Sequence, residues 1–272
     1  MNPLTLVLSG GSVRGFGILG AIQYIDETRD IKNISSYFGT SAGAMISYLL
    51  CMGLKPLEIV HMILKENLLE KLKMDINIDD LLESQGIVNF DCITEELELI
   101  TLAKFGKLFT LRTLYEELGK ELGCVTFNYT KGKMEYLHYS ITPNIPCLKA
   151  IQMSSSIPFM FNKCIHNNCL YIDGGVVDNL PIRMALKLGK FNIIAVSMNY
   201  VSKSESTSIT ISRLINIPIT EKTSKTIKKF RKRIPIIPIT SDNADFNFNL
   251  SIPEIMDLFS HGYMSAKNIL DL

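Results

Sequence analysis

Ser41 is the residue whose surroundings most clearly predict chemistry. It is the central residue of Gly39-Thr40-Ser41-Ala42-Gly43, a G-x-S-x-G pattern between a short apolar run and a largely apolar segment. This pattern favours a sharp turn from strand to helix that exposes the serine hydroxyl, and the following helix directs its N–H groups at the site. Gly39 and Gly43 allow neighbouring backbone to approach closely. The turn predicts a nucleophilic serine, although the same residues also suit an ordinary tight connection capped by serine.

A second glycine-rich turn follows the first apolar run of the chain. Because the carboxyl ends of parallel strands share one sheet edge, we expect this turn to lie beside Ser41. A phosphate-binding loop is the alternative, since Gly15-Phe16-Gly17-Ile18-Leu19-Gly20 matches G-x-G-x-x-G. That match begins inside a predicted helix and lacks a ribose-binding acid, which disfavours nucleotide binding. The turn therefore predicts an oxyanion hole formed by Gly10, Gly11, Ser12, Arg14 and Gly15.

A nucleophilic serine needs a base, and the chain offers two arrangements. Asp173 ends a predicted strand and precedes two glycines, so it can be presented at the same sheet edge, although such an aspartate also starts many plain turns. Of the four histidines, only His261 completes the order Ser, Asp, His used by α/β-hydrolases. That fold places several strands before its serine, whereas only 38 residues precede Gly39. We expect Asp173 to be the base, with Ser41-Asp173-His261 as the alternative.

The elements that must position these residues alternate between strand and helix. Short apolar runs at Leu4–Leu8 and Ile34–Phe38 are typical of buried strands, and helical spacing follows at Gly15–Glu27 and Ala42–Met52. This alternation predicts an α/β fold, a three-layer sandwich in which a central, mostly parallel sheet has helices on both faces.

The rest of the chain continues this alternation. We expect one domain over residues 1–272, with a catalytic core at about 4–200 and a strand-and-helix extension at 201–272. Asp91 and Thr110 are predicted helix N-caps. The spacing predicts helices at Leu57–Leu72, Ile93–Phe105, Leu111–Leu122 and Pro253–Leu270, a hairpin of Cys124–Thr130 and Met134–Ser140, strands at Leu170–Ile172, Phe191–Met198 and Ile234–Ile239, and a polar linker at Ser202–Ser208.

Composition excludes several classes of function. The 28 Lys and Arg residues nearly balance 27 Asp and Glu, and a net charge of +1 gives no reason to expect a nucleic-acid partner. The N-terminus lacks the basic region of a signal peptide, no stretch approaches 18 apolar residues, and the six scattered cysteines are expected to be reduced. We therefore expect a cytoplasmic protein. Cys164, His166 and Cys169 lie close together but lack a clear fourth ligand, so no metal is expected.

Three ordered motifs, SGGSVRG, GTSAG and DGGVVDNLP, resemble the patatin-like phospholipase family. The spacers LTLRTLYEELGKEL and ITPNIPCLKAIQMSSSIPFMF resemble it too, and the resemblance runs from about Leu4 to about Gly189. It implies a patatin-like fold and a Ser–Asp dyad, with Ser41 as nucleophile and Asp173 as base, and no cofactor or metal. Ser12 departs from the family pattern, because the family usually has a third glycine there.

The resemblance also implies a phospholipid or another acyl lipid as substrate. Apolar helices between residues 55 and 105, with Met52, Met62 and Met74, could line an acyl groove, or could be plain core. A basic cluster could rest on an anionic membrane surface, or could be a solvated face. A catalytically inactive lipid-binding or interaction protein on the same scaffold is the alternative function. The basic cluster comprises Lys225, Lys228, Lys229, Arg231, Lys232 and Arg233.

Overall fold

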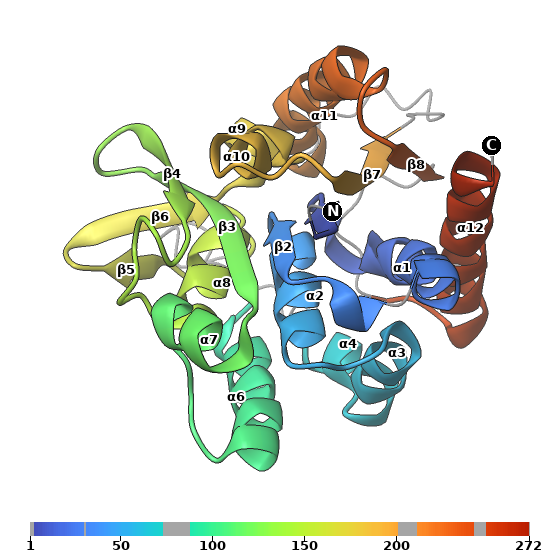
Figure 1. Cartoon of the computed structure of the whole chain (residues 1–272). Coiled ribbons are helices and arrows are strands. Elements are labelled where there is room, and N and C mark those ends of the chain that lie inside the picture. Colours follow the sequence, from blue (N-terminus) through green and yellow to red (C-terminus); the bar gives the residue numbers. More distant parts are fainter. Residues whose placement is uncertain (1–2, 30, 73–87, 201–210, 242–248, 272) are drawn as a thin grey trace.

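The computed structural model describes residues 3–29, 31–72, 88–200, 211–241 and 249–271 (Figure 1). The predicted polar linker at 202–208 and Met74 lie outside these residues.

The described strands form one eight-stranded sheet of the order β5-β6-β3-β2-β1-β7-β8, with β4 paired to β3. Strands β3, β2, β1, β7 and β8 are parallel to their neighbours in that order, whereas β4, β6 and β5 join antiparallel. The strands are β1 (Thr5–Leu8), β2 (Ser36–Gly39), β3 (Glu121–Asn128), β4 (Lys133–Leu137), β5 (Cys164–His166), β6 (Cys169–Asp173), β7 (Ile193–Tyr200) and β8 (Ile236–Ser241). The predicted mostly parallel sheet is confirmed.

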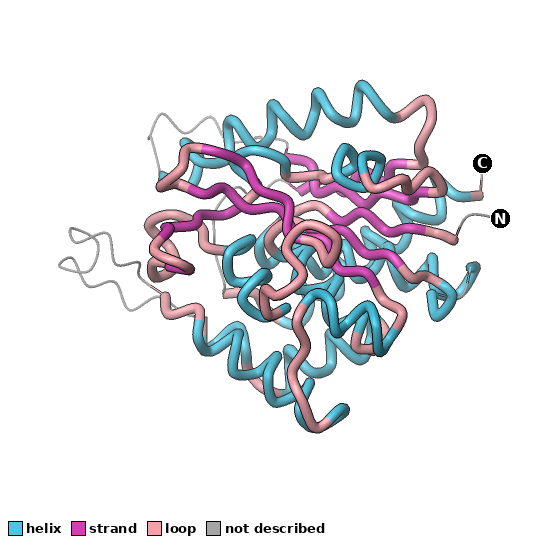
Figure 2. The backbone as a smooth tube through the Cα atoms, turned by 60° about the vertical axis from the view of Figure 1, so that its left-hand side comes forward, coloured by secondary structure: helices cyan, strands magenta, loops and turns pink. Residues whose placement is uncertain are grey.

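Helices cover both faces of the sheet, as Figure 2 shows for the strand layer seen from the side. Side chains alternate along a strand, so Leu6 and Leu8 of β1 pack into one core and Val7 into the other. The larger core is formed with α1 (Gly15–Arg29), α2 (Ala42–Cys51), α3 (Pro56–Lys65), α4 (Leu68–Lys71), α6 (Asp91–Phe105), α7 (Leu111–Leu118), α8 (Cys147–Ser155) and α12 (Ile252–Leu270). The smaller core is formed with α9 (Gly175–Asp178), α10 (Ile182–Lys187) and α11 (Ile211–Phe230). Short 3₁₀ helices occupy Ser12–Arg14 (η1) and Ile31–Asn33 (η2).

Register aligns the strand ends that carry the candidate site. Leu8, the last residue of β1, is paired with Gly39 of β2 on one side and with Val196 of β7 on the other. The segments that follow β1 and β2 therefore leave the sheet at the same edge, while β7 continues past them to Tyr200. This alignment brings the two glycine-rich turns side by side.

The glycine repeat of α1 serves helix packing. A Cβ atom on Gly20 would lie 1.8 Å from the carbonyl oxygen of Phe259, and one on Gly262 would lie 1.8 Å from that of Gly17. Helices α1 and α12 thus approach so closely that a side chain at these positions would clash. The G-x-G-x-x-G match lies within a helix, which agrees with the interpretation that it is not a nucleotide-binding loop.

Most predicted elements are confirmed, including the β3–β4 hairpin, the Thr110 cap and the closing helix. Three predictions were wrong in their bounds. The helix predicted at 57–72 is broken at Asn67, which has φ +51°. The helix predicted at 111–122 ends at Leu118, because Gly119 adopts φ +63° and β3 follows. Asp91 is the first helical residue and not the cap, which is Phe90.

No single helix in the described part of the chain is long and apolar enough to cross a membrane, and α2 and α3 reach that composition only as a pair bent by 113°. All six cysteines are unpaired, and five of them are buried.

Candidate active site

The turn around Ser41 is held in a strained conformation by close backbone packing. Ser41 has φ +55° and ψ −124°, a region that residues with a Cβ rarely occupy. A Cβ atom on Gly43 would lie 2.5 Å from the carbonyl oxygens of Leu8 and Ser9, so only glycine lets α2 begin this close to β1. The arrangement matches the nucleophile elbow that the sequence predicts. Ser41 is nearly buried, and the N-terminus of α2 begins at the next residue.

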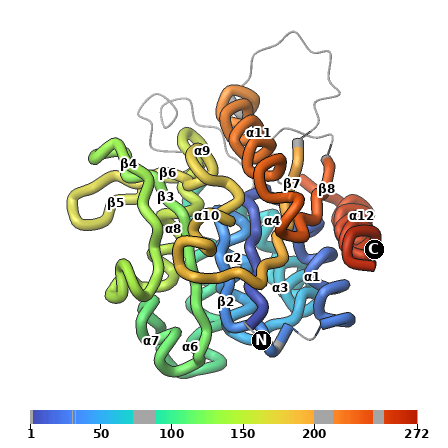
Figure 3. Tube along the Cα trace, turned by 45° about the horizontal axis from the view of Figure 1, so that its top comes forward, coloured from blue at the N-terminus to red at the C-terminus, as the bar shows by residue number. Residues whose placement is uncertain are grey.

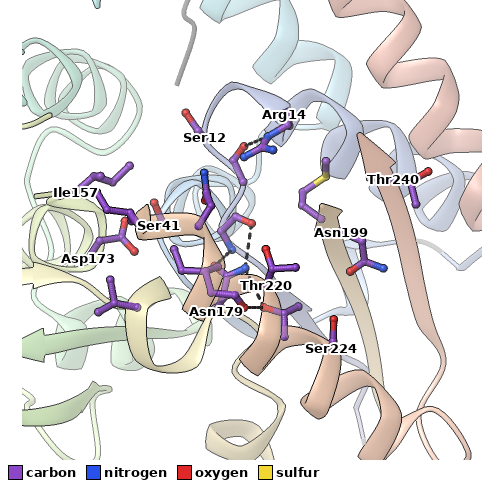
Figure 4. Close-up of a pocket in the computed structure, with 18 residues that line it drawn as sticks. Ser12, Arg14, Ser41, Ile157, Asp173, Asn179, Asn199, Thr220, Ser224 and Thr240 are labelled. Atoms are coloured by element: carbon purple, nitrogen blue, oxygen red, sulfur yellow. Dashed lines mark hydrogen bonds between the residues drawn. The ribbon is translucent and has the colours of Figure 1, made fainter. Parts of the chain in front are cut away.

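Asp173, the last residue of β6, is buried next to Ser41 (Figure 4). Its Oδ1 accepts a 2.6 Å hydrogen bond from the N–H of Gly175, while its Oδ2 has no hydrogen-bond partner of normal geometry among the described residues. Burial raises the pKa of Asp173 to about 6, and the nearby Ser41 hydroxyl and the Gly175 N–H partly oppose that rise. The carboxyl is therefore a stronger base than an exposed aspartate, and it lies in the same cavity as Ser41.

The serine-rich end of α8 connects the two residues, a role the sequence reasoning missed. Ser154 Oγ accepts a 3.1 Å hydrogen bond from the N–H of Ser41. The carbonyl oxygen of Ser156 accepts the N–H of Asp173 at 2.9 Å, and that of Ser154 accepts the N–H of Gly174 at 3.2 Å. One short segment thus fixes the backbone on both sides of the site. The run Ser154-Ser155-Ser156, two residues before Pro158, was the signal that the sequence offered.

The first glycine-rich turn lies beside Ser41, and its N–H groups differ in availability. The N–H of Gly10 is donated to Asn179, at 3.1 Å from Oδ1 and 3.2 Å from the carbonyl oxygen. The N–H groups of Arg14 and Gly15 are bonded to carbonyl oxygens within the turn itself. Those of Gly11 and Ser12 have no acceptor among the described residues. Of the five predicted oxyanion residues, these two have N–H groups free to bind an oxyanion.

Ser12 and Arg14 shape the turn in different ways. Ser12 has φ +51°, a left-handed conformation that glycine adopts without strain. In this chain serine occupies the position and adopts the same conformation. The Nε of Arg14 donates to the carbonyl oxygen of Gly11 at 3.1 Å, and the side chain is almost fully buried. Arg14 therefore stabilises the turn by binding the backbone of a residue three positions earlier in the chain.

Asn179 is a second residue that the sequence reasoning did not single out. Besides accepting the N–H of Gly10, its Nδ2 contacts the carbonyl oxygen of Gly10 and the hydroxyl of Thr223 on α11, each at 3.5 Å. Dashed lines in Figure 4 mark these contacts. Asn179 links the glycine turn to α11. Its position in DGGVVDNLP, six residues after Asp173, was the signal that could have found it.

Two cavities of different character meet at Ser41. The larger, of about 270 Å³, contains Asp173 and Asn179 and is bounded by the ends of β7 and β8 and by α11. The smaller, of about 140 Å³, is lined mainly by apolar side chains of α1, α2, α3, α4 and α6. Ser12, Ser41 and Ile157 line both cavities. A molecule bound across Ser41 would thus meet a wall of mixed polar and apolar groups on one side and an almost wholly apolar wall on the other.

Comparison with known proteins places this arrangement in a family. The sequence profile described as patatin-like phospholipase matches residues 6–186, which include Ser41, Asp173 and the glycine turn. The chain belongs to the patatin-like phospholipase family. The resemblance seen in the three motifs is thereby confirmed.

Individual relatives agree with this assignment. A probable lipid hydrolase of Invertebrate iridescent virus 6 is 37% identical over 190 residues, covering 67% of this chain and 63% of the viral protein. An uncharacterised mimivirus protein, R571 of Acanthamoeba polyphaga mimivirus, is 27% identical over 96% of this chain and 92% of its own length. The chain therefore spans less than two thirds of the lipid hydrolase.

Solved structures show the same fold. VipD from Legionella pneumophila superposes with a TM-score of 0.59 at 18% identity, covering 100% of this chain and 67% of VipD. The Pseudomonas aeruginosa effector ExoU gives 0.54 at 17% identity, covering 99% of this chain and 53% of ExoU. The predicted patatin-like α/β fold is confirmed by these similarities.

The remaining predicted residues differ in their distance from Ser41 and Asp173. His261 is exposed on α12, with its Nε2 3.5 Å from the hydroxyl of Thr240, and it lines neither cavity. Met62 lines the apolar cavity, whereas Met52 is core. In the part of the chain that the structure describes, no group of three or more His, Cys, Asp or Glu side chains is placed to hold a metal ion.

Proposed function

We propose that this chain is a lipid acyl hydrolase of the phospholipase A type that uses Ser41 and Asp173 as a catalytic dyad. The observation that carries the proposal is the buried Asp173, with its raised pKa, next to a serine in a strained strand-to-helix turn; the Oδ2 of Asp173 has no hydrogen-bond partner of normal geometry among the described residues. Membership of the patatin-like phospholipase family and the similarity to a probable viral lipid hydrolase support it.

In the first half of the reaction, Asp173 accepts the proton of the Ser41 hydroxyl as Oγ attacks the ester carbonyl. The tetrahedral oxyanion is held by the free N–H groups of Gly11 and Ser12, each contributing about 3 kcal/mol by analogy with other oxyanion donors. The carbon–oxygen bond to the alcohol then breaks, and Asp173 returns the proton to the leaving alkoxide. A lysolipid or alcohol departs, and Ser41 is left acylated.

In the second half, a water molecule attacks the acyl-serine while Asp173 accepts one of its protons. The same oxyanion site stabilises the second tetrahedral intermediate. Its collapse breaks the bond to Ser41 Oγ, which regains its proton from Asp173, and the fatty acid is released. The scheme requires no metal and no cofactor, since the two side chains carry every proton that moves.

The apolar cavity is suited to the acyl chain. Its lining includes Leu19, Leu49, Met62 and Leu97, drawn from four helices, and it opens directly at Ser41. Such an apolar pocket favours a hydrocarbon chain because burying each CH₂ group contributes about 0.8 kcal/mol. Glu96, which pairs with Lys71 at 3.7 Å, is the one charged residue among those described in its wall.

Covalent labelling tests the dyad directly. A fluorophosphonate probe is expected to label Ser41 in the wild-type protein, and Ser41→Ala is expected to abolish both labelling and the release of fatty acid from phospholipid vesicles. Ser260→Ala is the matched control, because Ser260 is exposed on α12 and lines neither cavity. A folded wild-type protein that neither labels nor releases fatty acid would contradict the dyad and favour a catalytically inactive protein on the same scaffold.

The basic cluster at the end of α11 is proposed to hold the protein on anionic membranes. All six side chains are exposed, and Leu214 and Ile217, 55% and 62% exposed, lie earlier on the same helix. Lys225 is partly neutralised by Glu221 at 2.6 Å, so the five later residues carry most of the available charge. Each Lys or Arg close to an anionic surface contributes about 1 kcal/mol to binding.

Vesicle flotation tests this membrane contact. The wild-type protein is expected to float with vesicles that contain anionic lipid and to stay behind with neutral vesicles. The triple variant Lys228→Gln, Lys229→Gln, Lys232→Gln is expected to lose flotation. Changing the exposed Lys107, Lys131 and Lys133 to Gln alters the net charge equally at a different place and serves as control. Equal flotation of both triple variants would contradict a specific role of the cluster.

A further inference from the structure

The larger cavity beside Ser41 is walled by a helix from outside the part of the chain that matches the family. The match ends at residue 186, whereas α11 spans Ile211–Phe230. Figure 3 shows α11 lying across the molecule near β7 and β8. Asn216, Thr220, Thr223 and Ser224 all line the cavity, together with Ile215 and Ile219. These positions repeat every three to four residues, so one face of the helix is directed at the cavity.

The lining of this cavity mixes hydroxyl and amide groups with aliphatic side chains, and its described residues carry little charge. Besides the α11 residues, it includes Asn199 of β7 and Thr240 of β8, which Figure 4 shows on the side away from Ser41 and Asp173. Among the described lining residues the charged ones are Asp173 and Arg14, and none is aromatic. Hydroxyl and amide groups both donate and accept hydrogen bonds, which is what a neutral alcohol group requires.

This lining is poorly suited to a cationic group. An ammonium or quaternary ammonium ion is bound by carboxylates or by the faces of aromatic rings. In the described wall of the cavity the one carboxylate is Asp173, which the proposed reaction uses as its base. Choline and ethanolamine would therefore lose their hydration at this wall without an ionic or aromatic partner in exchange.

The position of the cavity decides which part of a substrate it contacts. Both cavities include Ser41, and the apolar one accommodates hydrocarbon, so an ester bound at Ser41 directs its acyl chain to one side and its alcohol to the other. We propose that the α11 cavity is a binding site for the alcohol part of the substrate and prefers head groups rich in free hydroxyls, such as glycerol, inositol or a sugar. This inference rests on the proposed lipid hydrolase function.

A pair of lipids of equal charge tests the preference. Phosphatidylglycerol and phosphatidylmethanol with identical acyl chains both carry one negative charge, and only the first has free hydroxyls in its head group. Diluted to the same fraction in neutral detergent micelles, they present the same surface charge to the basic cluster. The full chain is expected to show a kcat/KM about tenfold higher for phosphatidylglycerol, since each neutral hydrogen bond contributes a factor of roughly 2–12. Phosphatidylcholine with the same chains is expected to be a poorer substrate than phosphatidylglycerol.

Variants of α11 connect the preference to the cavity. The double variant Thr220→Val, Ser224→Ala is expected to lower the rate with phosphatidylglycerol about fivefold to tenfold and to leave phosphatidylmethanol within twofold. Thr226→Val removes a hydroxyl from the same helix at a position that does not line the cavity, and it is expected to keep the wild-type ratio. Equal rates for both lipids in the wild type, or an equal loss on both in the double variant, would overturn the inference.

A binding measurement separates this inference from the proposed reaction. In Ser41→Ala, soluble dihexanoyl phosphatidylglycerol is expected to bind several-fold more tightly than dihexanoyl phosphatidylmethanol, as measured by calorimetry without turnover. If Ser41→Ala binds the phosphatidylglycerol more tightly but the wild-type protein hydrolyses neither lipid, the dyad is refuted and the head-group site is kept. Hydrolysis of both lipids with equal affinities would refute the site and keep the dyad.

Discussion

Replacing Asp173 with asparagine is expected to abolish hydrolysis and, at neutral pH, to stabilise the fold. Asp173 is buried, and burial raises its pKa to about 6 from an ordinary value of 3.8. Between pH ~4 and ~6 the folded chain holds a proton on this carboxyl that the unfolded chain releases. The folded state binds more protons there, so the stability contributed by this group falls as the pH rises through that window. Above it, the folded protein contains a buried charge that asparagine would remove.

The two pKa values give the size of the effect. At about 1.4 kcal/mol for each pH unit between them, the rise from 3.8 to about 6 corresponds to ~3 kcal/mol of destabilisation above pH ~6. That is the upper limit of what asparagine can recover, and its amide oxygen can still accept the N–H of Gly175. For a chain of this size about 1 kcal/mol shifts Tm by ~2–4 °C, so the variant is expected to melt up to ~6–12 °C higher.

Thermal unfolding at pH 4 and at pH 8, with fatty-acid release measured in parallel, tests this reasoning. Asp178→Asn is the matched control, because burial also raises the pKa of Asp178 to about 6, its Oδ2 accepts the Tyr136 hydroxyl, and it lines neither cavity. Both variants are expected to gain stability at pH 8 and little at pH 4. Only Asp178→Asn is expected to stay active, with kcat/KM rising to half its plateau near pH 6. If the Tm of Asp173→Asn at pH 8 is equal to or lower than that of the wild type, the conclusion that Asp173 is buried with a raised pKa is refuted.

Three further predictions concern the residues around the dyad. Ser41→Gly is expected to be inactive yet more stable than Ser41→Ala by about 1 kcal/mol in chemical denaturation, because glycine accepts φ +55° without strain; equal stability would contradict the strained turn. Ser12→Gly is expected to gain about 1 kcal/mol for the same reason and to keep its activity, and a large loss of kcat would show that the side chain takes part in the reaction. Asn179→Ala is expected to lower kcat roughly 10- to 100-fold with KM within about twofold, because it releases the Gly10 turn that carries the oxyanion donors; a change in KM alone would assign Asn179 to substrate binding.

Much of the fold was predictable because its signals are local. Short apolar runs, each followed by a glycine-rich turn and a segment with helical spacing, predict a parallel sheet. The Thr110 cap and the closing helix are also predicted by local patterns. The errors occurred where tertiary contacts override periodicity. Apolar spacing continues through Leu122, but the chain turns at Gly119 because Glu121 must pair with Ser36 in the sheet. Spacing along one element contains no information on that pairing.

Helix α11 was not predicted at all. Its basic end is recognisable in the sequence only as a charged cluster, and its first half carries Pro218 among isoleucines and polar residues, which gives no strong helical period. The helix forms because Ile227 and Phe230 pack against the smaller core and Thr223 contacts Asn179.

The sequence by itself determined the two candidate catalytic residues, because a strained turn after a strand needs glycines at set spacing and because an aspartate before two glycines ends the strand β6. Tertiary structure alone decided that the N–H of Gly10 is not free, since Asn179 reaches it across 169 positions. It also decided the raised pKa of Asp173, since burial arises from packing and not from neighbours in sequence. The separation of a cavity with mixed polar and apolar lining from an almost wholly apolar one at Ser41 depends on helices that are distant along the chain, and no local pattern could place them there.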